Sequence, residues 1–173
     1  MPPSPGLTFF CPTESMVIAL GGGFMGWVDL SQAILLCDVL AGNPEVHYIA
    51  LTPQPAEAVK SQQLTGPNAR AYRDIAVVQG YIKFVVHQTH IRPWSFSNGT
   101  YVSDDWTATT YRWKINLGCY WQGQWEEVCR CNASEITGSL GKMLGNKEAE
   151  SLPPLQRLHT GLPTISLDED DVV

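Results

Sequence analysis

Short apolar segments run along most of this chain, and in its second half apolar and polar residues alternate with the period of two that is typical of β-strands. In the first half these segments lie at residues 16–20, 26–30, 33–39 and 46–51. Each segment is short, and glycine or proline occurs in the connections between several of them, as in antiparallel hairpins. The pattern therefore predicts four consecutive antiparallel strands.

The second half repeats this pattern. Residues 73–86 predict a hairpin that turns at Gln79-Gly80, with Ile82, Phe84 and Val86 on one face. Two further strands are expected at 106–115 and 125–131, after a loop at 92–105 that is marked by Arg92-Pro93 and Asn98-Gly99. Residues 163–173 indicate a strand, an acidic turn at 168–171 and the start of another strand.

The predicted fold class is all-β and antiparallel, with about two four-stranded units like propeller blades and a partial, incomplete third unit. The length of 173 residues fits one domain. We expect a flexible proline-rich lead at 1–13 and a single partial β domain at 14–173. Within that domain, a Pro/Gln-rich connection is expected at about 52–72 and a mobile insertion at about 134–160.

A glycine run offers a different interpretation. Gly21, Gly23 and Gly26 match the G-x-G-x-x-G pattern that holds a dinucleotide pyrophosphate in a βαβ unit, and residues 31–41 would accept a helix. Against this, bulky residues at 27–30 follow the last glycine, and no acid ends the next strand to hold a ribose. We favour a hairpin at the glycines, and residues 31–41 stay open between strand and helix.

The composition of the chain limits the classes of partner that we expect. Apolar residues make up 44% of the chain, charged residues only 16%, and the net charge of −6 comes with no basic cluster, so nucleic acid is not an expected partner. No secretion signal is recognisable at the N-terminus, and acidic residues and glycines interrupt the apolar run at 16–40, which predicts no membrane span. We expect an intracellular protein of the cytoplasm or nucleus, with its five cysteines as thiols.

Candidate chemistry is sparse. His87, His90, Cys129 and Cys131 could supply four zinc ligands, but on one strand the two histidines would point to opposite faces. The sequence therefore assigns no catalytic, cofactor-binding or metal-binding residue. Among the six tryptophans we expect Trp27 and Trp113 in the core and Trp94 on a surface loop.

Several blocks carry a family resemblance in the same order as in the family: residues 26–30, 34–40, 73–78, 82–85 and 163–173. Over about residues 16–173 the chain resembles the grass-expanded plant family of domain of unknown function 1618. Members of that family have Trp-Arg-Gly where this chain has Ser31-Gln32-Ala33, which puts the local turn in doubt, and they usually continue beyond the acidic stretch. The resemblance implies a plant intracellular protein, a truncated member, often compared with F-box-associated propeller-like domains, and no activity.

These observations lead to one functional hypothesis and one alternative. The hypothesis is a non-enzymatic, propeller-like interaction module whose partner is another protein, with no cofactor. The alternative is a fragment of a dinucleotide-binding oxidoreductase that uses the glycine run from Gly21 to Gly26. The oligomeric state is not predicted.

Overall fold

The structure is a computed structural model that describes residues 15–51, 69–95, 100–116, 122–136 and 162–167. These residues form two antiparallel sheets of four strands each, so the all-β class and the two four-stranded units are confirmed. Within them, helix is limited to a 3-10 turn, η1 (Ala69–Ala71), and one helical turn at 133–136. The predictions for the lead at 1–13 and for most of 52–72 and 134–160 lie outside the described residues.

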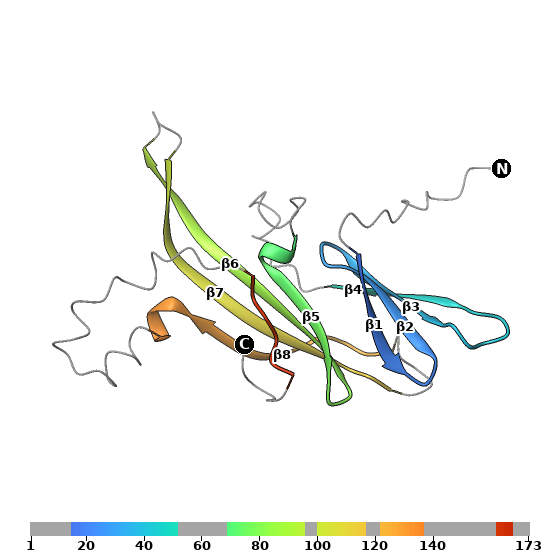
Figure 1. The fold of residues 1–173 in the computed structure, drawn as a ribbon. Coiled ribbons are helices and arrows are strands. Elements are labelled where there is room, and N and C mark those ends of the chain that lie inside the picture. Colours follow the sequence, from blue (N-terminus) through green and yellow to red (C-terminus); the bar gives the residue numbers. More distant parts are fainter. Residues whose placement is uncertain (1–14, 52–68, 96–99, 117–121, 137–161, 168–173) are drawn as a thin grey trace, which may run out of the picture.

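Sheet A is the N-terminal sheet. It contains β1 (Ser15–Gly21), β2 (Phe24–Asp29), β3 (Ala33–Asp38) and β4 (Val46–Ala50), in the order β1-β2-β3-β4 (Figure 1). Side chains alternate between its faces, so Val28 is fully buried on the inner face whereas the neighbouring Trp27 is 36% exposed on the outer face. The prediction that Trp27 belongs to the core is therefore wrong.

Sheet B repeats the same order of strands. It contains β5 (Arg73–Val78), β6 (Tyr81–Ser95), β7 (Thr100–Lys114) and β8 (Glu126–Asn132), in the order β5-β6-β7-β8. The predicted turn at Gln79-Gly80 is confirmed, and both of its residues have positive φ, 49° and 81°. Such a pair matches the right-handed twist of the strands it joins.

The inner faces of the two sheets share one hydrophobic core. Its fully buried side chains include Leu30, Ile34, Leu36 and Leu51 from sheet A and its flanks, and Ile82 and Phe84 from sheet B. Ile82, Phe84 and Val86 lie on one face as predicted, and Trp113 is buried as predicted. The first strands, β1 and β5, lie beside each other (Figure 1).

The glycine run forms a hairpin. Residues 21–23 have φ values of 87°, 59° and 91°, a region that costs glycine nothing, and they carry the chain from β1 into β2. Gly26 is not part of this turn but lies inside β2. A Cβ there would come within 2.9 Å of Ile18 Cγ1 and 3.0 Å of Ile34 Cγ2, so close packing of the inner face requires glycine at this position.

The alternative of a βαβ unit is wrong for this region. Residues 33–38, which the sequence left open between strand and helix, form β3, and β3 pairs antiparallel with both β2 and β4. A phosphate cradle of the G-x-G-x-x-G type needs a helix that starts at the glycines. Here a strand starts there, so the oxidoreductase interpretation loses its structural basis.

The predicted loop at 92–105 is also wrong. β6 continues to Ser95 and β7 starts at Thr100, and the two pair along almost their whole length. The pairing shifts register between His90 and Ile91 and again between Pro93 and Ser95. Such irregularities are where a strand accommodates proline, which explains why Pro93 does not end β6.

The C-terminal segment 162–167 is not the strand that the sequence predicted. Leu162 has a φ of 56° and Pro163 has no N–H to donate, so the segment lacks the regular geometry of a ladder. Instead Ile165 packs against Val78 and Val85 on the outer face of sheet B. The acidic stretch 168–171 lies outside the described residues.

Candidate functional site: a groove beside strand β4

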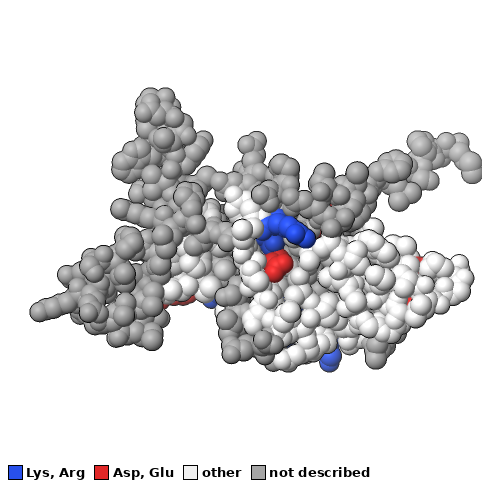
Figure 2. Space-filling view, viewed as in Figure 1, with Lys and Arg blue, Asp and Glu red and all other residues white. Residues whose placement is uncertain are grey.

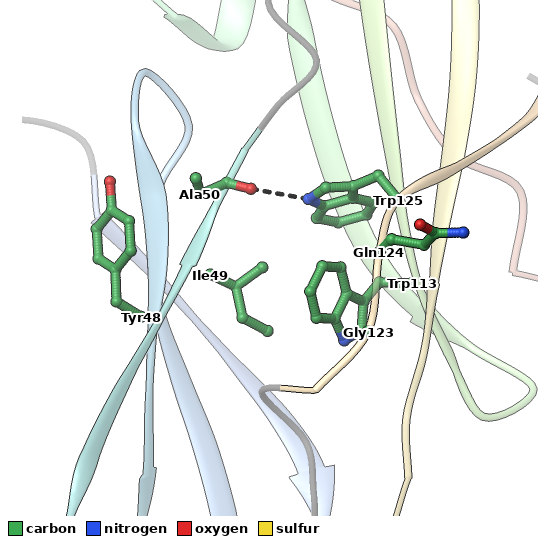
Figure 3. Close-up of a pocket in the computed structure, with 7 residues that line it drawn as sticks. All are labelled: Tyr48, Ile49, Ala50, Trp113, Gly123, Gln124 and Trp125. Carbon is green, nitrogen blue, oxygen red and sulfur yellow. Dashed lines mark hydrogen bonds between the residues drawn. The ribbon is translucent and has the colours of Figure 1, made fainter.

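A groove of about 410 Å³ lies between the edge of sheet A and the connection from β7 to β8 (Figure 3). This volume is typical of a ligand site. The groove is lined by Tyr48, Ile49, Ala50, Trp113, Gly123, Gln124 and Trp125. None of these side chains carries a charge.

Aromatic rings form one wall of the groove. The rings of Trp113 and Trp125 meet edge to face with centroids 5.5 Å apart, and Phe84 lies 5.8 Å behind Trp125. Gly123 allows the backbone to lie directly on this wall, since a Cβ there would be 3.0 Å from Cε2 of Trp113. Aromatic pairs of this kind present a large, rigid and apolar surface.

The two walls of the groove are joined by one hydrogen bond. The indole Nε1–H of Trp125 donates to the carbonyl oxygen of Ala50 at 2.8 Å (Figure 3). This bond links sheet A to the start of β8 and gives the N–H of a half-buried indole its hydrogen-bond acceptor. It fixes the ring of Trp125 at the end of β4.

The opposite wall is the free edge of β4. The Leu51 N–H donates a hydrogen bond to the Gln32 carbonyl. The register that pairs Ile49 with Ile34 places these two residues directly opposite each other. In an antiparallel ladder the bonded pairs alternate, so residues 47, 49 and 51 face β3, and the backbone groups of Val46, Tyr48 and Ala50 point away from it. The Trp125 bond to Ala50 agrees with this alternation. No described strand pairs with this edge.

Tyr48 presents its backbone to the groove more than its ring. Figure 3 shows the ring of Tyr48 directed away from the two tryptophans, while Ile49 points toward them. The side chain of Tyr48 is 60% exposed on the outer face of sheet A. The groove therefore combines backbone donors and acceptors on one side with aromatic surface on the other.

The zinc-ligand candidates lie elsewhere. His87 and Cys131 both pair with Ala108, so they share a row on the outer face of sheet B, and Cys129 faces the same side two residues away. Burial, with Cys129 close by, raises the pKa of the Cys131 thiol. The described residues contain no group of three or more His, Cys, Asp or Glu that could hold a metal ion, and the side chain of His90 is not among them.

The sequence identified only part of the groove. Trp113 was expected only as a core residue and Trp125 was given no role, whereas Trp94, the expected surface residue, has a side chain outside the described residues. No sequence pattern marked the other lining residues Ile49, Ala50 and Gln124 as part of a binding site. They become lining residues only because the two sheets stack, which no local pattern reveals.

The turn at residues 29–33, which the family resemblance left open, is well formed. The backbone N–H of Ser31 donates to Asp29 Oδ1 at 2.8 Å, and the Ser31 hydroxyl donates to the same oxygen. Gln32 N–H closes the turn on the Asp29 carbonyl at 3.0 Å. The Asp29 side chain thus caps this turn.

The fold and the groove define an all-β protein built from two stacked, four-stranded antiparallel sheets. Residues 27–173 match the family described as Protein of unknown function (DUF1618), and because this match covers most of the chain, the chain belongs to that family. No curated protein and no solved structure matches the chain. Within the described residues, no helix is both long and apolar enough to cross a bilayer.

Proposed function

We propose that the chain is a non-enzymatic interaction module of propeller-like type, and that the groove beside β4 binds an extended segment of another protein. The architecture supports the first part. Two successive four-stranded meanders stack through apolar faces with their first strands side by side, as neighbouring blades of a propeller do.

The observation that carries the binding proposal is the free edge of β4 next to an aromatic groove. An extended peptide can add to such an edge as a fifth strand, with the outward backbone groups of Val46 and Tyr48 as its hydrogen-bond partners. Main-chain bonds then provide affinity, and a side chain that enters the groove provides selectivity.

The chemistry of the groove restricts that side chain. An apolar or aromatic group gains contact with Trp113 and Trp125, whereas a charged group would lose its hydration with no opposite charge among the lining residues. The bound segment is therefore extended, short and uncharged at the position that enters the groove. β4 itself has five residues, which limits the pairing to a few bonds.

A selection experiment tests this proposal. The full chain is used to select from a phage-displayed library of random peptides, and the selected peptides are synthesised and their affinity is measured by calorimetry. Gln124→Glu places a charge at the rim of the groove, which the exposed Gln124 lines, and should weaken the binding of an uncharged peptide. Gln122→Glu is the matched control, because Gln122 is an exposed neighbour that does not line the groove.

The experiment has one set of outcomes that supports the groove as the binding site and one that contradicts it. Uncharged peptides that bind the native chain and the Gln122→Glu variant alike, but not the Gln124→Glu variant, support the groove as the site. Equal affinity for both variants, or enrichment of strongly charged peptides, contradicts it.

A further inference from the structure

Apart from the row that contains Asp29, the outer face of sheet A is apolar across all four strands. Two rows of directly paired residues cross it, and none of their side chains carries a charge. The first row is Val17, Trp27, Leu35 and Tyr48; the second is Ala19, Met25, Cys37 and Val46.

Much of this face is uncovered. Val17 is 50% exposed, Trp27 36%, Tyr48 60% and Val46 65%. The inner face of the same sheet, by contrast, packs against sheet B in the shared core. Contiguous exposed apolar surface of this kind marks a contact site, because isolated apolar residues are common on surfaces but whole rows are not.

We propose that this face packs against the same face of a second copy of the chain. Each chain carries a net charge of −6, so two copies repel in most orientations. No charge of either copy lies in the two rows, so charge does not oppose contact through this face. Figure 2 shows that the surface over sheet A on the side in view is almost free of charged residues.

Side-chain size supports an identical partner. With a two-fold axis parallel to the strands, β1 of one copy faces β4 of the other and β2 faces β3. Trp27 then lies opposite Leu35 of the second copy, and Tyr48 lies opposite Val17. Each contact pairs an aromatic with a smaller side chain, as interdigitation of two stacked sheets about 10 Å apart requires.

The available area sets the strength of this dimer. Aromatic side chains offer about 150–250 Å² each, so Trp27 and Tyr48 alone leave roughly 200 Å² uncovered per copy. When the aliphatic members of both rows are added and the two copies are counted together, the buried area approaches the lower limit of about 1,000 Å² for a specific interface. Interfaces of this small size are typical of weak and transient contacts, so we expect the dimer to be reversible.

Sedimentation of the full chain over a range of concentrations tests the proposal. The average mass should rise from 19.1 kDa toward twice that value as concentration increases. Val17→Lys puts a charge at an exposed position of the first row and should raise the dissociation constant at least tenfold, and Val46→Lys should do the same from the second row. Leu167→Lys is the control, because Leu167 is 65% exposed but follows the segment that lies on sheet B.

Circular dichroism of each variant checks that it folds. A chain that stays at 19.1 kDa at every concentration overturns the proposal, whatever covers the face. Equal weakening by Val17→Lys and Leu167→Lys overturns it too, since that result indicates a head-to-tail contact between sheets A and B. Peptide binding in the groove should survive Val17→Lys, so the failure of one proposal is distinguishable from the failure of the other.

Discussion

At the scale of single residues, Gly26 shows how tightly the inner face of sheet A is packed. Its place is inside a strand, where glycine normally weakens structure, yet a Cβ there would meet Ile18 and Ile34 at 2.9 and 3.0 Å. We predict that Gly26→Ala lowers the free energy of unfolding by about 1–3 kcal/mol through overpacking. Denaturant titration measures this change.

Gly42→Ala is the control for this prediction. A Cβ at Gly42 meets nothing within 4 Å, so this variant should change the free energy of unfolding by less than about 0.5 kcal/mol. Equal effects of the two substitutions would contradict close packing at Gly26.

His87 links stability to pH. Its side chain is buried on β6 beside the ring of Trp106, and burial lowers the pKa of the imidazole below its ordinary value of 6.5. The unfolded chain therefore binds the proton more readily than the folded chain, so this contribution to stability is present above pH 6.5 and is lost as the pH falls below it. We predict that the free energy of unfolding decreases on acidification from neutral pH.

Denaturant titrations at several pH values between 7.5 and 5 check this prediction. A His87→Gln variant should show a smaller loss over this range, because its side chain takes up no proton. If both chains lose stability equally, other groups account for the pH dependence.

At the scale of elements, Arg73 joins the start of β5 to the turn between β2 and β3. Its Nη1 donates to the Leu30 carbonyl at 2.7 Å and to the Ser31 carbonyl at 3.2 Å, and the residue is only 3% exposed. Burial lowers the pKa of this guanidinium, and the nearby Asp29 opposes that effect. We predict that Arg73→Met costs about 2–3 kcal/mol, since it removes charge-assisted bonds from buried carbonyls.

Thermal or denaturant unfolding of Arg70→Met provides the comparison. Arg70 lies three residues earlier and is exposed, so its loss should change stability by less than about 0.5 kcal/mol. A small effect at Arg73 would mean that its two hydrogen bonds contribute little to holding the sheets together.

The strands themselves are largely predictable from the sequence. The hairpin of β5 and β6 follows from the alternation of Ile82, Phe84 and Val86 and from the turn residues at 79 and 80. The far halves of β6 and β7 were missed because Pro93 is a strong signal for a loop. The structure keeps Pro93 within a strand because the pairing of β6 with β7 is irregular there, and the sequence does not show this irregularity. Helix and strand could not be separated for β3, whose sequence suits both.

At the scale of the whole molecule, the sequence does not show which surfaces meet. Val28 and Trp27 are both apolar, so no contrast between polar and apolar residues tells the inner face of β2 from its outer face. The groove depends on a contact between residues 75 positions apart, Ala50 and Trp125. Only the stacking of the sheets brings them together, and this is why the candidate site could not be derived from local patterns.

The central claim is that β4 accepts an added strand beside the aromatic groove. Amide hydrogen exchange of the full chain, measured with and without a peptide selected from the library, tests it most directly. The Tyr48 N–H, which points away from β3, should exchange at least tenfold more slowly in the complex, whereas the Ile49 N–H, already directed at β3, should change little. A peptide that binds tightly and leaves the exchange of Tyr48 unchanged would contradict the claim.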